Sequence, residues 1–332
     1  MPGPILIVDD EPINLAILRD ILDEQYDVVF ARNGAEALEA VAKHRPVLIL
    51  LDVQMPGMNG YEVCLRLKAS ATTEDIPVIF VTTLGSDWQE EAGFAAGCVD
   101  YITKPVSASV VHARVRTHLS LISAQRLEGA YRDAVFMLGE AGHFNDTDTG
   151  VHIWRMAAYS RALAEAANWP RERVDLIELA APMHDTGKIG IPDAILKKPT
   201  MLDAAEWTVM RNHSRIGYEI LKKSDAPVFQ MAAEVALHHH EKWDGSGYPC
   251  GLAGTAIPEA ARIVAVADVF DALTMKRPYK PAWPVDQALA YLDAGAGVHF
   301  DPAMIALFRR ITPGILAIKT EWERREGGGE AA

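Results

Sequence analysis

Residues 176–188 read LIELAAPMHDTGK, and they decide how the second half of this 332-residue chain folds. The run from Leu176 to Met183 is almost wholly apolar, so we expect the pair His184 and Asp185 that follows it to enter the interior of a domain. A buried carboxylate is costly unless a metal ion or another cation balances its charge. The stretch therefore predicts a metal site inside this domain.

Histidine and carboxylate side chains recur at helix-scale intervals on both sides of this pair. One such histidine alone is more often a core or surface residue, but the series as a whole indicates a metal centre. Imidazole and carboxylate suit first-row transition metals, and the lack of thiolate among them favours an open hydrolytic site over a structural zinc cage. We therefore predict a metallohydrolase whose candidate ligands are His152, His184, Asp185, His213, His239, His240 and Asp268.

The second half of the chain has helical patterns without competing strand alternation. We predict an all-α helical bundle over residues 143–320, in which ligands project inward from several helices. The tail at 321–332 ends in glycine, glutamate and alanine, and we expect it to be disordered. The expected helices cover 151–166, 172–184, 204–222, 227–239, 258–273, 285–294 and 302–310.

The first half has a different pattern. Short apolar runs at 5–8, 27–30, 47–51 and 78–81 alternate with helix-patterned stretches such as 14–24 and 34–44. This alternation predicts an α/β domain with a doubly wound parallel sheet. Ligands of such sheets gather at the carboxyl ends of the strands, where crowded carboxylates favour Mg²⁺. The polar residues at those ends are Asp9, Asp10, Asp52, Thr82 and Lys104.

These positions resemble a two-component receiver domain over about residues 1–120. A single strand-end aspartate can merely cap a turn, but five matching positions favour the receiver. The resemblance implies a cognate sensor histidine kinase, and phosphorylation would add about −1.5 to −2 charges, enough to bias a switch. It implies Asp52 as phosphoacceptor, Asp9 and Asp10 as the Mg²⁺ pocket, Thr82 and Lys104 as phosphate contacts, and Tyr101 as conformational reporter.

Residues 107–142 are nearly free of helix breakers and predict one long connecting helix. Its apolar residues follow a partial 3.5-residue repeat, which can pack on its own domain or form a coiled-coil-like contact between subunits. We predict a homodimer. The repeat consists of Leu121, Ala124, Tyr131, Val135 and Leu138.

Composition limits the partners and the compartment. The net charge is −13, and residues 1–106 hold 7 Lys and Arg against 17 Asp and Glu, which argues against DNA binding. The sequence has neither a long uncharged apolar stretch nor a signal-peptide pattern, so we expect no membrane insertion and a cytoplasmic protein. The only cysteines, Cys64, Cys98 and Cys250, are far apart and suggest no disulfide, and we assign them no role.

Two motifs resemble the HD-GYP family of metallophosphohydrolases: HDTGK at 184–188 and HHEKWDGSGYP at 239–249. The resemblance spans about residues 148–280 and includes AVADVFDAL at 265–273 and RPYK at 277–280. It implies hydrolysis of cyclic di-GMP to pGpG, with GMP left open as a further product, at two or three ions, often iron or manganese. It assigns the seven candidate ligands to that centre.

Two further residues, Asp148 and His238, lie beside these ligands in the sequence. Asp148 stands where three-metal members carry glutamate, and its shorter side chain favours two ions. His238 precedes the two histidines of the motif, and we expect it to pack or to support the ligands.

Two neighbouring ions, with Asp185 able to bridge them, can turn a bound water into the hydroxide that attacks phosphorus. We expect Lys188 to neutralise phosphate or protonate the leaving oxygen, unless it is a solvated surface lysine. By the resemblance, Arg277 and Lys280 contact substrate, and Tyr248 can stack or hydrogen-bond.

The family loop that carries Tyr248 is also associated with GGDEF-type diguanylate cyclases as partners. Two alternatives stay open: a noncatalytic cyclic di-GMP sensor or scaffold, and a hydrolase of another cyclic dinucleotide or a nucleoside phosphate.

Overall fold

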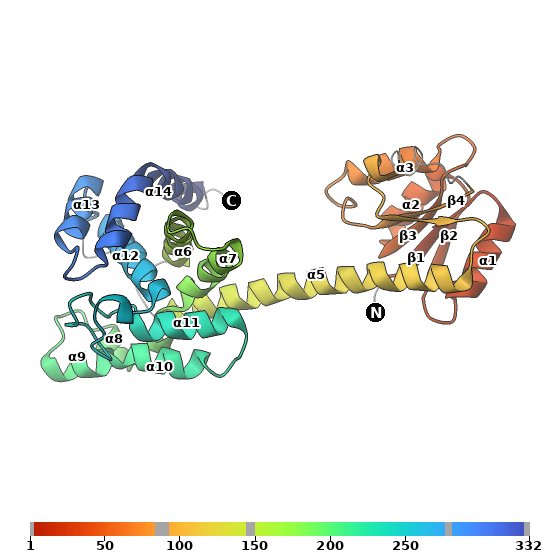
Figure 1. Ribbon diagram of the computed structural model, residues 1–332. Coiled ribbons are helices and arrows are strands. Elements are labelled where there is room, and N and C mark those ends of the chain that lie inside the picture. Colours follow the sequence, from red (N-terminus) through yellow and green to blue (C-terminus); the bar gives the residue numbers. More distant parts are fainter. Residues whose placement is uncertain (1–2, 84–92, 144–149, 276–280, 329–332) are drawn as a thin grey trace. The chain divides into compact units, whose positions relative to one another are not determined.

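The computed structural model describes residues 3–83, 93–143, 150–275 and 281–328 (Figure 1). The chain forms two compact units, Met1–Gly129 and Ala130–Ala332, and helix α5 (Ala108–His143) begins in the first and ends in the second. Within the described ranges, no helix combines the length and the apolar character needed to span a membrane.

The first unit contains a five-stranded parallel sheet, which confirms the predicted α/β class. The strand order β2-β1-β3-β4-β5 brings the ends of β1, β3 and β5 to one edge, where the predicted acidic site should lie. The fifth strand had not been predicted. The strands are β1 (Ile5–Val8), β2 (Val28–Ala31), β3 (Leu48–Asp52), β4 (Val78–Thr82) and β5 (Asp100–Thr103).

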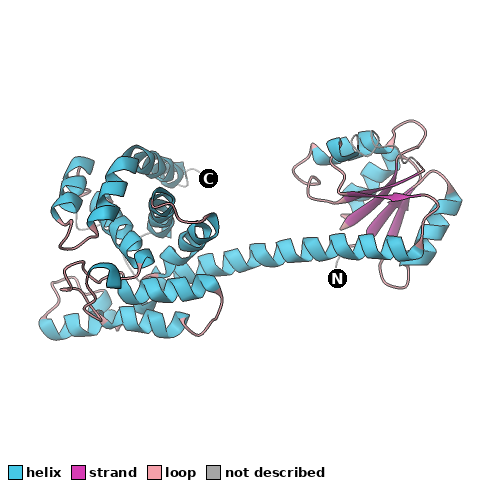
Figure 2. Ribbon diagram, viewed as in Figure 1, coloured by secondary structure: helices cyan, strands magenta, loops and turns pink. Residues whose placement is uncertain are grey.

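Helices cover both faces of this sheet (Figure 2). Alternate side chains point to opposite faces of a strand. Ile5 and Ile7 therefore pack with α1 (Pro12–Leu22) and α5, whereas Leu6 and Val8 pack with α2 (Gly34–His44) and α3 (Gly60–Lys68). Burial on both faces explains why the strands are continuous apolar runs.

The apolar repeat of the connecting helix divides between two environments. Val135 is buried in the core of the second unit, and the Tyr131 ring packs edge-on against Phe229 at 6.2 Å. Leu121 is 55% exposed, and Leu127, which lies outside the repeat, is 72% exposed. The carboxy-terminal part of the repeat thus packs on its own domain.

The second unit is helical, as predicted. Its main core combines α6, α7, α12, α13 and α14, and a smaller one combines the end of α5 with α7 and α11. Short 3-10 turns, η1 (Ala181–Met183), η2 (Thr186–Gly190) and η3 (Gly254–Ala256), join the helices. The helices are α6 (Gly150–Ala166), α7 (Arg171–Ala180), α8 (Asp193–Leu196), α9 (Ala204–Met210), α10 (Asn212–Leu221), α11 (Pro227–His238), α12 (Glu259–Thr274), α13 (Val285–Ala294) and α14 (Pro302–Gly328).

Three predicted boundaries were wrong. The helix expected at 172–184 ends at Ala180 and continues as η1, and the helix expected at 204–222 divides at Arg211. The tail expected to be disordered from residue 321 is helical up to Gly328. Ion pairs one turn apart, such as Glu321 with Arg325, support this last segment.

Candidate functional site

In three of the candidate ligands, the imidazole ring is held by a hydrogen bond to a backbone carbonyl three residues earlier. The Nδ1–H of His184 donates to Ala181 O at 2.9 Å, that of His213 to Met210 O at 2.8 Å, and that of His239 to Ala236 O at 3.1 Å. Carbonyls in the last turn of a helix often lack a backbone donor within it, and each ring donates to a carbonyl at such a position. Ala181 O also accepts from the His184 backbone N–H at 3.1 Å. A carbonyl can only accept, so Nδ1 carries the proton and Nε2 is left as the metal-binding nitrogen.

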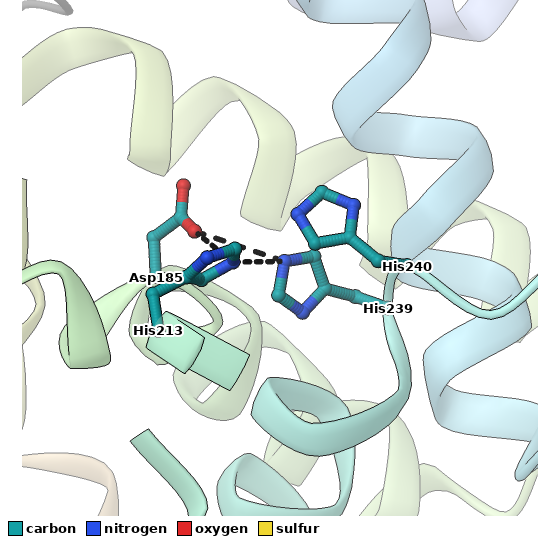
Figure 3. Close-up of side chains that lie close together, drawn as sticks. All are labelled: Asp185, His213, His239 and His240. Carbon is teal, nitrogen blue, oxygen red and sulfur yellow. Dashed lines mark hydrogen bonds and ion pairs between the residues drawn. The ribbon is translucent and has the colours of Figure 1, made fainter. Parts of the chain in front are cut away.

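Figure 3 shows Asp185 beside the His213 ring, with the rings of His239 and His240 next to it. Its Oδ1 is 3.3 Å from His213 Nε2 and 3.7 Å from His239 Nε2. The ring of His240 lies beside that of His239, with centroids 4.0 Å apart. One ligand atom from each of these four residues lies within 4.8 Å of the others, so one metal ion could be held among them.

The second oxygen of Asp185 faces another group of candidate ligands. Its Oδ2 is 3.2 Å from His184 Nε2, which is 4.0 Å from Asp268 Oδ1. The same Asp268 oxygen lies 3.8 Å from His152 Nε2. The structure thus brings all seven candidate ligands together, in two adjoining groups that share Asp185.

Two residues that the sequence analysis did not single out orient His152. Its Nδ1 contacts the fully buried carboxylate of Asp271, which also accepts from Arg155 Nη2 at 2.9 Å. Metal-binding histidines commonly donate their other nitrogen to such a carboxylate. Only their spacing in the sequence could have indicated these two residues. Asp271 lies three residues after Asp268, and Arg155 lies three residues after His152, which is about one helical turn in each case.

A close backbone contact sets the distance between Asp185 and His213. A Cβ atom added to Gly187 would lie 1.8 Å from His213 O and 2.4 Å from Gly217 N. Only glycine therefore lets η2 pack directly on α10. The glycine of the HDTGK motif is needed for this approach.

Charged groups in the centre shift one another's pKa values. Burial disfavours ionised Asp185, but Lys188 and His184 outweigh it and hold its pKa well below the ordinary value. Burial likewise opposes the charge on His184, yet Asp185 and Asp268 raise its pKa to about 9. Burial lowers the pKa of His213 to about 4, so this ring is a neutral donor at physiological pH. The carboxylates that hold a proton on His184 would attract a divalent metal ion in its place, and the neutral His213 ring could bind the same kind of ion.

Polar and aromatic side chains line the centre next to its ligands. Lys188 Nζ lies 2.8 Å from Asp185 Oδ2. The Tyr248 ring stacks on His240 with centroids 4.7 Å apart, and the Arg211 guanidinium lies 5.1 Å from the Tyr248 centroid. Arg211 was not predicted, and its place two residues before His213 was the only hint in the sequence.

Glu241 holds the loop that carries Tyr248. Its buried carboxylate accepts from the backbone N–H of Cys250 at 2.7 Å and of Leu252 at 3.0 Å. His238 faces Glu241 and lies outside the group around Asp185.

Three residues with expected roles, Asp148, Arg277 and Lys280, lie outside the described residues.

The receiver site lies at the strand ends of the first unit. Lys104 Nζ bonds Asp9 Oδ2 at 2.7 Å and Asp52 Oδ2 at 2.8 Å. One oxygen each from Asp9, Asp10 and Asp52 lies within 4.8 Å of the others, a grouping that suits a hard cation. Burial raises the pKa of Asp52 although Lys104 opposes the shift.

The two other receiver residues lie on neighbouring strands. Thr82 ends β4 and is buried, and its carbonyl accepts from the Lys104 N–H at 2.8 Å. Tyr101 in β5 is partly buried and packs edge-on against Phe94 at 6.4 Å. Thr82 therefore lies at a strand end beside Lys104, whereas Tyr101 lies within β5, three residues before Lys104.

Comparisons with known proteins match both units. The family model of the response regulator receiver domain matches residues 5–116, and that of the HD domain matches residues 130–304. The cyclic di-GMP phosphodiesterase response regulator RpfG of Xanthomonas campestris pv. campestris is 40% identical, over 92% of this chain and 87% of the relative.

Two further relatives differ in how much they share. A cyclic di-GMP phosphodiesterase of Thermotoga maritima is 34% identical, over 97% of this chain and 93% of its own length. A 3'3'-cGAMP-specific phosphodiesterase 2 of Vibrio cholerae is 44% identical over 57% of this chain and 36% of its own. Both units and their order are thus shared with full-length relatives, and the chain belongs to the family of response regulators in which a receiver domain precedes a metal-dependent HD-GYP phosphodiesterase domain.

Proposed function

We propose that this chain hydrolyses a phosphodiester bond of cyclic di-GMP and that phosphorylation of Asp52 regulates the reaction. The observation that carries the proposal is the position of Asp185, whose two oxygens face two separate groups of histidines. A carboxylate in this position suits a centre of two metal ions. The names of two full-length relatives support cyclic di-GMP as substrate.

The proposed ligands divide between two ions. His152, His184 and Asp268 with Asp185 Oδ2 would hold one ion, and His213, His239 and His240 with Asp185 Oδ1 would hold the other. Nitrogen and oxygen donors of this kind suit iron or manganese. Such ions supply an activated water and stabilise negative charge at phosphorus. A third ion would need Asp148.

The chain's own residues bind and orient the dinucleotide. Lys188 faces the centre beside Asp185, where its ammonium can neutralise a phosphate oxygen or give a proton to the leaving oxygen. The stacked Tyr248, with Arg211 beside it, offers a surface for a guanine base. Arg277 and Lys280 are proposed as further substrate contacts. The expected product is pGpG, with GMP as a second step.

Regulation is proposed to act through the receiver site and the connecting helix. A sensor histidine kinase would supply the phosphoryl group, and Mg²⁺ would bind at Asp9, Asp10 and Asp52. The exposed Leu121 and Leu127 of α5 support a homodimer contact, because burying large exposed apolar side chains against a second helix favours association. GGDEF-type cyclases are proposed to bind the loop around Tyr248.

The decisive experiment incubates the full-length chain, loaded with iron or manganese, with cyclic di-GMP and separates the products by chromatography. We expect pGpG from the wild type and none from Asp185→Ala, which should also lose metal by elemental analysis. Tight binding of cyclic di-GMP without turnover under either metal would instead identify a sensor or scaffold. Retained metal in Asp185→Ala would contradict the proposed ligand set.

A second candidate substrate is 3'3'-cGAMP. The relative named as a 3'3'-cGAMP-specific phosphodiesterase is 44% identical over 57% of this chain, so sequence similarity alone does not separate the two dinucleotides. Rates measured in parallel on both substrates decide between them. A higher kcat/KM for 3'3'-cGAMP would replace cyclic di-GMP in the proposal and leave the metal centre intact.

A further inference from the structure

We propose that His238, Glu241 and Cys250 form a separate binding site for a zinc-class divalent ion, which we call the loop site. One ligand atom from each lies within 4.8 Å of the others. None of the three belongs to the group around Asp185. They come from the end of α11, the residues just after it, and the loop beyond Tyr248.

Glu241 is the fixed anion of the loop site. Its side chain is fully buried, and the N–H groups of Cys250 and Leu252 donate to its two oxygens. Each carboxylate oxygen has a further lone pair, so an ion can still bind. The same bonds hold the backbone of Cys250 against the carboxylate, which places the thiol close to it.

His238 supplies a buried nitrogen that is not otherwise used. Its Nδ1 lies 3.8 Å from Glu241 Oε1, too far for a hydrogen bond, and it has no other hydrogen-bond partner among the described residues. A buried polar atom without a partner costs about 1–3 kcal/mol. A metal ion between the ring and the carboxylate would satisfy both groups.

Cys250 supplies a sulfur ligand, and its exposed side chain lets a metal ion reach the loop site from solvent. It is exposed, whereas Cys64 and Cys98 are buried in the receiver core. A set of one nitrogen, one oxygen and one sulfur ligand suits zinc, and water can take the fourth position. A triangle with sides of 4.8 Å, the upper limit here, has its centre about 2.8 Å from each corner, so the ligands must close by at most about 0.5–0.8 Å to reach bonds of ~2.0–2.3 Å. Rotation of the exposed Cys250 side chain can supply much of this.

An ion here would tie the loop to the end of α11, which His239 and His240 directly follow. Tyr248, which stacks on His240, lies within the segment closed in this way. Occupancy of the loop site is therefore expected to restrict that loop.

Cobalt tests the loop site independently of any hydrolytic activity. A cysteine ligand gives Co²⁺ a thiolate charge-transfer band in the near ultraviolet, which histidine and carboxylate ligands do not give. We expect this band in the full-length chain and its loss in both Cys250→Ser and His238→Gln. Cys98→Ala, which alters a receiver cysteine, should keep the band. Absence of the band at saturating Co²⁺, or its persistence in His238→Gln, would overturn the proposal.

Thiol labelling gives a second test that needs no folded Cys250 variant. Zinc at about ten times its dissociation constant leaves about one site in eleven free, so labelling of Cys250 should slow about tenfold. In His238→Gln the same zinc concentration should slow labelling far less. Equal protection in the two proteins would show that the ion does not use His238.

Discussion

Replacing Gly187 by alanine tests whether the close packing of η2 on α10 builds the metal centre. The added Cβ would lie 1.8 Å from His213 O, a backbone atom that cannot rotate away. The contact must lengthen by about 1.6 Å to reach 3.4 Å, where ordinary van der Waals contact begins. The two segments must therefore separate.

The size of this separation decides the effect on metal binding. Asp185 Oδ1 and His213 Nε2 are now 3.3 Å apart. If the whole shift falls on this pair, the gap becomes about 4.9 Å, whereas two ligands on one ion with bonds of ~2.0–2.2 Å can be at most about 4.4 Å apart. We expect metal affinity to fall by at least about tenfold and the free energy of unfolding by about 1–3 kcal/mol.

Calorimetric titration with Mn²⁺ and urea unfolding measure these two quantities. Gly314→Ala is the matched control, because it makes the same chemical change within α14, where an added Cβ meets nothing within 4 Å. That variant should keep the affinity and gain up to about 1 kcal/mol in stability. Wild-type affinity and stability in Gly187→Ala would refute the argument that this contact positions His213.

Other residues give tests of the same kind. Asp271→Asn should lower the free energy of unfolding by about 3–5 kcal/mol because Arg155 loses its buried anion; the double variant with Arg155→Met should recover part of it, and strictly additive losses would contradict the pairing. Acetyl phosphate should add a phosphoryl group to the wild type, seen by intact mass, but not to Asp52→Asn; labelling of both would exclude Asp52. Burial lowers the pKa of Lys104, but its two carboxylate partners outweigh this and raise it. The stability that charged Lys104 contributes is therefore present below about pH 10.5 and lost as the pH rises above that value. In Lys104→Met the melting temperature should depend less on pH above about pH 10.5. A profile identical to that of the wild type would contradict this. Arg211→Ala should raise KM for cyclic di-GMP more than it lowers kcat, whereas a change in kcat alone would argue against a role in base binding.

The parts of the fold that could be predicted depend on local periodicity. Strands β1 and β3 are buried on both faces, so their apolar runs were easy to identify. Strand β5 was missed because its sequence, DYIT, has polar residues at both ends and only one fully apolar side chain. The division at Arg211 was missed because no helix breaker marks it in the sequence. In the structure, the Nδ1–H of His213 donates to Met210 O at the end of α9.

The candidate ligands could be predicted because metal sites need particular residue types, and those types are visible in the sequence. Their supporting residues were harder to find. Asp271 lies 119 positions from His152, and only the packing of α6 on α12 brings the two together. The loop site was missed for a related reason. Glu241 turns the chain so that Cys250 comes back to it, and no short spacing pattern indicates that turn.

The hydrogen bonds at Nδ1 also imply an order in which the metal centre assembles during folding. His184, His213 and His239 are each oriented by a carbonyl three residues earlier. Each ring can therefore take up its orientation as soon as the backbone turn that contains it has formed. His152 is oriented by Asp271 on a distant helix and is aimed only after α6 and α12 have docked. If two ions bind as proposed, the one held through His152 should leave first on gradual denaturation, so that a chain with a single ion precedes the fully unfolded one.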